Sequence, residues 1–237
     1  MSKTTIPTGG ITADAINGTL IADDAINSEH YTDGSIDTAH IGDSQVTAAK
    51  TSGVGGTAKL LQVKVSDGTA TSYLTHDNVF SATYDFYKLI GFTNASAVDG
   101  NLRFRWRSGG SDISGSYYRG VGQGVNLDSS GSETATLNVA RYNDSVFDLT
   151  DTTNNNNNFG DLFEITLAGM FDRDEGLIAT LKASINQFRS NSNYRQYQYG
   201  GFYANQGANE NYDGFKLWYS NANVQYYSYA VYGFNKW

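Results

Sequence analysis

The chain has 237 residues and a formal net charge of −8, with 39% hydrophobic, 14% aromatic and 17% charged residues. This acidic balance argues against nucleic-acid binding, which needs a basic surface to displace counterions from phosphate. The chain has neither cysteine nor a run of about 18 apolar residues, so we expect no disulfide, no thiolate chemistry and no membrane insertion.

Residues 1–10 are a short leader without the apolar stretch of a secretory signal. Residues 11–50 then contain a ten-residue repeat in four copies, ITADAINGTL, IADDAINSEH, YTDGSIDTAH and IGDSQVTAAK. The first and sixth columns hold an apolar residue in every copy. We expect these residues to lie along the axis of a stalk: Ile11, Ile16, Ile21, Ile26, Tyr31, Ile36, Ile41 and Val46.

An apolar residue at every fifth position fits neither a helix, with a period of 3.6, nor a strand, with a period of two. Ordering forty residues costs about 40–80 kcal/mol of backbone entropy. Burying eight such side chains returns only about 12–24 kcal/mol. We therefore predict an intertwined homotrimeric stalk, in which other copies supply the missing burial. A monomeric solenoid and an acidic disordered tail are the alternatives.

Two groups of acidic residues are candidates for cation binding. Asp23, Asp33 and Asp43 share the third column of the repeat, and three acids stand within residues 172–175. The second group does not fit a twelve-residue calcium loop. We interpret the column as a solvated face and residues 172–175 as a hairpin turn, and we assign no metal or cofactor.

Residues 51–58 are rich in glycine and are interpreted as a linker. Residues 59–237 alternate strand-like runs with Gly, Asn and Ser turns, which predicts an all-β antiparallel β-sandwich or jelly-roll head and no helix longer than two turns. The expected strands are 60–65, 80–93, 101–108, 133–142, 162–170, 177–185, 215–220 and 224–234.

The clearest strand is 101–108, where Leu102, Phe104 and Trp106 fall on one face and three arginines on the other. Three polar or glycine-rich features are interpreted as loops or turns instead: the segment around His76, the glycines of 120–124 and the asparagines of 154–158. The glycines lack the lysine and helix of a phosphate-binding loop.

Aromatic side chains among amides and guanidinium groups suit saccharide binding, because ring faces stack on sugars while polar neighbours bond hydroxyl groups. Packing in the core or against a neighbouring subunit is the alternative. In 215–219 the alternation places Trp218 on the face opposite Phe215. The candidate glycan or receptor contacts are Tyr194, Arg195, Tyr197, Tyr199, Tyr203 and Trp218.

Several segments resemble a β-sandwich domain common in structural proteins of tailed phages. Residues 84–90 (YDFYKLI) resemble its opening strand, 101–118 its next strand and loop, and 212–234 its closing hairpin. The repeat, as in 21–30 (IADDAINSEH), resembles the stalks of marine phage fibres. The resemblance implies a tail fibre, head fibre or capsid decoration and brings no catalytic residue.

We therefore expect a non-enzymatic virion fibre protein, assembled in the host cytoplasm. Its leader would attach to the capsid, to the portal or adaptor, or to the tail, with a slight preference for a head or vertex fibre or one seated on an adaptor. Its head would bind the host surface. A capsid cement protein without receptor binding is the alternative. A glycan-degrading enzyme is a weaker one, since the resemblance to phage proteins implies that such an activity needs a long groove, commonly on a large β-helix, and this chain does not supply that length.

Overall fold

The computed structural model divides the chain into two units, residues 1–55 and 56–237, which we describe separately. In the second unit it describes residues 58–96, 100–127, 130, 132–150, 160–171, 178–188, 194–204 and 211–235. In the first unit it describes residues 7, 9–12, 15–16, 19–21, 25–26, 31–33, 35–36 and 41–42. Val46, the linker up to residue 57, the asparagines of 154–158 and the acids of 172–175 lie outside these ranges.

In the first unit, features of the backbone conformation recur with the ten-residue period of the sequence. It bends at the first residue of all four copies, and an i to i+3 hydrogen bond recurs in two of them. Ala15 N donates to Thr12 O at 3.2 Å, and Ser35 N donates to Thr32 O at 2.9 Å. The seven described apolar side chains of the first and sixth columns are 37–53% exposed in the single chain.

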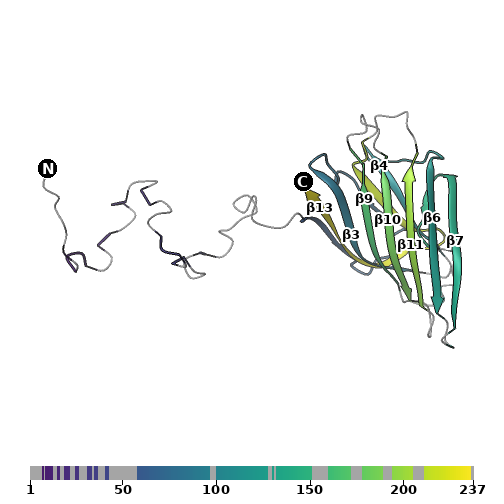
Figure 1. Cartoon of the computed structure of the whole chain (residues 1–237), viewed down its shortest axis with the longest axis horizontal. Helices are drawn as coiled ribbons and strands as arrows, with labels where there is room; N and C mark the ends of the chain where they lie inside the picture. Colours follow the sequence, from purple (N-terminus) through teal and green to yellow (C-terminus); the bar gives the residue numbers. More distant parts are fainter. Residues whose placement is uncertain are drawn as a thin grey trace. The chain divides into compact units, whose positions relative to one another are not determined.

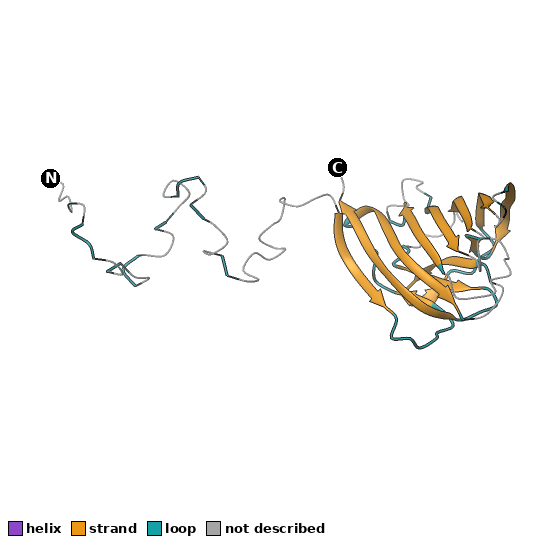
Figure 2. Ribbon diagram, turned by 90° about the horizontal axis from the view of Figure 1, so that it is seen from below, coloured by secondary structure: helices purple, strands orange, loops and turns teal. Residues whose placement is uncertain are grey.

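The second unit contains an eight-stranded antiparallel sheet, and its strands from β13 to β7 follow one another across Figure 1. The sheet is twisted and curved (Figure 2). Its order is β1 (Ala58–Val65), β13 (Val224–Asn235), β3 (Tyr84–Ala95), β9 (Asp161–Ala168), β10 (Thr180–Phe188), β11 (Tyr194–Tyr203), β6 (Tyr118–Leu127) and β7 (Glu133–Asp144).

A smaller antiparallel sheet packs against one face of the large sheet. Its order is β2 (Leu74–His76), β12 (Gly214–Tyr219), β4 (Leu102–Ser108) and β5 (Ser111–Asp112), with β8 (Phe147–Asp148) also paired to β4. The prediction of an all-β fold with antiparallel sheets is confirmed. The described residues include no helix, and accordingly none that could cross a membrane.

Aromatic rings fill the space between the two sheets. Phe215 of the small sheet lies 6.3 Å, between ring centroids, from Tyr229 of the large sheet, and Phe147 lies 5.9 Å from Tyr199. Trp106 is fully buried and meets Phe104 edge to face at 4.8 Å. Such rings bury large apolar areas and gain further from edge-to-face geometry, so they dominate the stability of this core.

One polar cluster interrupts the aromatic core. The fully buried Asp161 accepts hydrogen bonds from Tyr219 Oη at 2.6 Å and from Gln187 Nε2 at 2.9 Å. Thr93 Oγ1 lies 2.8 Å from the same tyrosine oxygen. Burial and the nearby charge of Asp161 raise the pKa of Tyr219 well above its ordinary value. Tyr219 therefore stays protonated and satisfies the buried carboxylate as a donor.

The expectation of a closing hairpin over 212–234 is wrong. β12 pairs with β2 and β4 in the small sheet, whereas β13 pairs with β1 and β3 in the large sheet. The chain therefore crosses from one sheet to the other at residues 220–223. In both strands inward-facing residues alternate with outward-facing ones, as they would in a hairpin. The sequence pattern therefore does not distinguish a hairpin from two strands in different sheets.

The glycines of 120–124 do not form a turn, contrary to the prediction. They lie in β6, paired with the tyrosine-rich strand β11 in a register that sets Gly122 opposite Tyr199 and Gly124 opposite Tyr197. A Cβ atom on Gly122 would lie 2.7 Å from Tyr199 Cδ2. Glycine at alternate positions thus leaves room for the tyrosine rings to lie over the neighbouring strand.

The close packing of Gly122 against Tyr199 leads to a prediction about stability. Gly122→Ala is expected to lower the free energy of unfolding by about 1–3 kcal/mol, because the new methyl group overpacks against Tyr199. Gly200→Ala in the adjacent strand is the matched control, since a Cβ there meets nothing within 4 Å. The control should change stability by less than about 1 kcal/mol. Urea unfolding measures both, and equal losses would contradict the role given to Gly122.

All eight predicted strands are present, with boundaries shifted by up to a few residues, but β2, β5, β6, β8 and β11 were not predicted. The interpretation of His76 as a turn residue is wrong. Its side chain points into the core from β2, where the imidazole stacks on Phe215 at 5.0 Å and Nε2 contacts the hydroxyl of Tyr229. Ala58, assigned to the linker, begins β1.

Candidate functional site

The outer face of the small sheet gathers cationic and aromatic side chains. β4 and β12 alternate as predicted: Phe104, Trp106 and Phe215 are buried, whereas the side chains between them are only partly buried. Antiparallel pairing sets Lys216 opposite Arg105 and Trp218 opposite Arg103. The period-two pattern of two separate segments therefore builds one continuous surface. Its outward members are Arg103, Arg105, Arg107, Lys216 and Trp218.

Carboxylates from neighbouring strands and loops pair with these cations. Arg103 Nε lies 2.6 Å from Asp148 Oδ1, and Arg107 Nε lies 2.7 Å from Asp77 Oδ1. Asp77 raises the pKa of Arg107, chiefly through its hydrogen bond. The pairs fix the directions of the long side chains on this face. One partner of each pair is about a third exposed, Arg103 at 30% and Asp77 at 34%, which limits what the pairs add to stability.

Asp112 of β5 is shared by three cations. Its Oδ2 lies 2.8 Å from Lys216 Nζ and 3.4 Å from Arg105 Nη1, and its Oδ1 pairs with Arg107. Burial acts to raise the pKa of Asp112, but the bonds and charges of Lys216 and Arg107 outweigh it and hold the pKa below its ordinary value. Asp112 therefore carries its negative charge at neutral pH.

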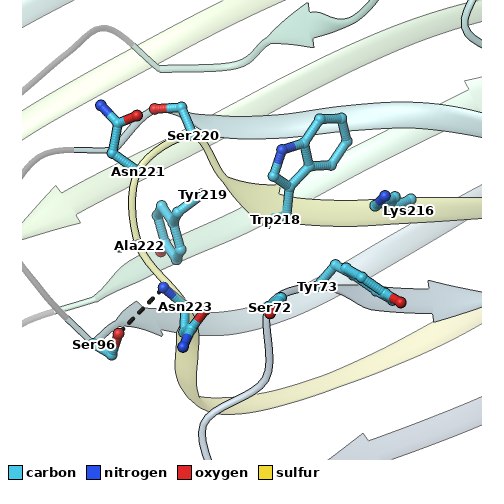
Figure 3. A pocket seen from close by; sticks show the side chains of 10 residues that line it. All are labelled: Ser72, Tyr73, Ser96, Lys216, Trp218, Tyr219, Ser220, Asn221, Ala222 and Asn223. Atoms are coloured by element: carbon cyan, nitrogen blue, oxygen red, sulfur yellow. Dashed lines mark hydrogen bonds between the residues drawn. The ribbon is translucent and has the colours of Figure 1, made fainter.

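An open pocket of about 540 Å³ adjoins this face at the end of β12 (Figure 3). The volume falls in the range of ordinary small-molecule sites. Tyr73 and Trp218 supply aromatic walls, and serine and asparagine side chains supply most of the rest. The lining residues are Ser72, Tyr73, Ser96, Lys216, Trp218, Tyr219, Ser220, Asn221, Ala222 and Asn223.

Hydrogen bonds between distant segments hold the pocket together. Asn223 N donates to Ser96 Oγ at 3.2 Å, drawn as the dashed line in Figure 3, and Ser96 N donates to Asn223 O at 2.8 Å. Thr71 and Val224 exchange two backbone hydrogen bonds of 2.8 and 2.7 Å, which fixes the segment that carries Tyr73. The pocket is thus formed by paired backbone segments and needs little rearrangement before a ligand binds.

Lys216 stands beside both aromatic walls. Its Nζ lies 4.4 Å from the centre of the Tyr73 ring and 5.2 Å from that of Trp218, while Arg105 approaches Trp218 at 5.1 Å. These cation–π contacts help to fix the rings. Aromatic faces, hydroxyl and amide groups and one ammonium group form a set that can stack on a sugar ring and bond its hydroxyl groups.

The six predicted contact residues do not lie together at one site in the structure. Tyr197, Tyr199 and Tyr203 are each 2% exposed and belong to the core, which fits the core alternative and leaves these rings away from the surface. Tyr194 and Arg195 are partly buried on β11, where Tyr194 donates to Asn186 Oδ1 at 2.5 Å and Arg195 donates to Asn126 Oδ1 at 3.0 Å. Of the six candidates, Trp218 alone lines the pocket.

Sequence reasoning missed the pocket's other members. Tyr73, 48% exposed, and Ser72 come from the segment before β2, and Ser96 follows β3. The only local signal was the polar SNAN sequence at 220–223, which indicates a turn after a strand. Among the described residues no three His, Asp or Glu side chains gather as metal ligands would.

Comparison of the chain with protein-family models, with curated proteins and with solved structures gives no match. The function is therefore inferred from the chemistry of the pocket and from the pattern of the repeat.

Proposed function

We propose that the chain is a non-enzymatic structural fibre protein of a virus particle, whose β-sandwich head binds a host-surface saccharide in the pocket beside Trp218. Residues 1–10 attach it to other virion proteins, and the repeat of 11–50 forms a homotrimeric stalk. Three heads on one stalk would strengthen a weak single-site affinity through multivalent attachment.

The observation that carries the proposal is the composition of the pocket. Trp218 and Tyr73 offer two aromatic surfaces, and Ser72, Asn221 and Asn223 surround them with hydroxyl and amide groups. Saccharides present the matching combination of apolar ring faces and hydroxyl groups. The exposed apolar columns of the repeat support the stalk, because a single chain leaves them in water while association would bury them.

Replacing Trp218 tests the proposed binding. Trp218→Ala is expected to weaken binding of the full-length protein to saccharides by about tenfold or more, because the loss of one stacked ring costs about 0.5–1.5 kcal/mol beyond the buried area. The experiment measures dissociation constants on an immobilised panel of bacterial and algal polysaccharides.

Tyr142→Ala is the control for this experiment. Tyr142 is 75% exposed on β7, the edge strand of the large sheet, and its loss removes an aromatic ring without touching the pocket. Binding should be unchanged in this variant. Equal affinity of Trp218→Ala and the wild type for every bound saccharide would refute the pocket as the binding site.

A capsid-decoration protein is the second candidate. The outer face of β6 exposes Val121, Val125 and Leu127 by 37–62%, and an apolar row of this kind suits contact with another protein better than contact with a sugar. Deletion of the gene discriminates between the two functions. Particles that lose shell stability but adsorb normally would favour decoration, and particles that adsorb poorly with a stable shell would favour host attachment.

A further inference from the structure

The charge of the pocket narrows the class of ligand further than its aromatic walls do. Lys216 is the only charged side chain among the described residues that line it, and no carboxylate lines it. This pocket distinguishes among ligands by their charge, because an anionic group can pair with the ammonium group of Lys216 and a neutral group cannot.

Lys216 shares its carboxylate partner with two other cations. Asp112 pairs with Lys216, Arg105 and Arg107, so its single negative charge does not neutralise all three. Asp213 also belongs to this sheet. It lies at the start of β12, beyond the end that carries the pocket, and its Oδ2 accepts a bond from Gly109 N.

The ammonium group of Lys216 is also held in place. Its side chain is 17% exposed, Asp112 accepts from it at 2.8 Å, and the rings of Tyr73 and Trp218 flank it. An anion that arrives at this corner of the pocket therefore meets a cation that has already lost most of its side-chain entropy. A charge-assisted hydrogen bond formed there is about twice as strong as a neutral one.

We propose that the pocket selects an acidic saccharide, whose carboxylate or sulfate group binds Lys216 while its ring packs against Trp218 and Tyr73. This inference rests on the proposed saccharide-binding function. Binding should weaken as salt is added, since part of the affinity comes from a partly exposed ion pair.

The test uses matched pairs of saccharides on the full-length protein. The acidic members are oligogalacturonate, oligoalginate, sialyllactose and a sulfated galactan, and each neutral partner is the same saccharide after carboxyl reduction or desulfation. At least one acidic member should bind, and its neutral partner should bind about tenfold more weakly. The reduced and desulfated arms show whether a carboxylate or a sulfate is the bound group.

Lys216→Gln is the informative variant, because Asp112 keeps Arg107 as a partner when the lysine is gone. It should remove the preference for the acidic saccharide, so that the roughly tenfold difference in affinity between the acidic saccharide and its neutral partner is lost. Lys182→Gln, an exposed lysine on β10 in the other sheet, is the matched control and should change neither affinity.

The outcomes separate this inference from the function on which it rests. If neutral saccharides bind as tightly as acidic ones, or Lys216→Gln leaves acidic binding intact, selection by charge is refuted and saccharide binding stands. If no saccharide of either kind binds the wild-type protein, both the inference and the proposed attachment function are refuted.

Discussion

Replacing Ile16, Ile26 and Ile36 with aspartate is expected to convert the full-length protein from a trimer to a monomer. These residues occupy the sixth column of three successive repeats and are exposed in the single chain. In a threefold stalk each substitution would bring three carboxylates together in the space that three isoleucines fill. Burying unpaired charges costs several kcal/mol per ion, which is more than burial of the remaining isoleucine side chains would return.

Light scattering of the purified protein measures the outcome directly. The wild type should have a molar mass three times the 25.8 kDa of one chain, and the triple variant should have the mass of one chain. A control adds the same three charges in the second column, as Thr12→Asp, Ala22→Asp and Thr32→Asp, and should remain trimeric. A monomeric wild type would refute the intertwined stalk and favour the solenoid or the disordered tail.

The alternation of side chains was the most reliable guide to the fold. Residues 101–108 and 215–220 show strict period-two patterns, and the structure buries Phe104 and Phe215 while leaving Arg105 and Trp218 on the outer face. Side-chain direction in a strand is fixed by its own backbone, so a local pattern suffices to predict it. The orientation of Trp218, and with it one wall of the pocket, was predictable for this reason.

The remaining walls of the pocket were not predictable because they depend on which strands pair. Tyr73 and Ser96 meet Asn223 only after residues 71 and 224 have paired and the chain has crossed between sheets. Nothing local to these residues encodes that meeting. The glycines of β6 show the same limit, because their function is to accommodate tyrosine rings from a strand more than seventy residues away.

The prediction of a turn at His76 was wrong for a related reason, and the position of this side chain in the core makes the stability of the head depend on pH. The polar sequence after it indicates a turn, yet the imidazole is 6% exposed and packs against Phe215 and Tyr229. Burial lowers the pKa of His76 from 6.5 to about 4, with the charge of Lys64 acting in the same direction and that of Asp77 opposing it. The folded head therefore holds this imidazole neutral.

The direction in which stability changes with pH follows from the number of protons that the folded and unfolded states bind. Below pH 6.5 the unfolded chain binds a proton at His76, while the folded head does not until the pH approaches 4. Because the unfolded state binds more protons in this range, stability falls as the pH is lowered. The loss begins near pH 6.5, reaches about 3 kcal/mol near pH 4 and then levels off, since each pKa unit corresponds to about 1.4 kcal/mol.

Urea unfolding followed by tryptophan fluorescence at pH 7.5, 5.5 and 4.0 measures this loss. His76→Gln keeps a polar side chain at the position but cannot titrate, so its stability should change with pH by about 3 kcal/mol less than that of the wild type. The comparison is made within each protein, so any constant cost of the substitution cancels. A double variant, His30→Gln with His40→Gln, removes the two other histidines and should keep the full wild-type dependence. If His76→Gln loses as much stability on acidification as the wild type, the buried imidazole is not the group that titrates.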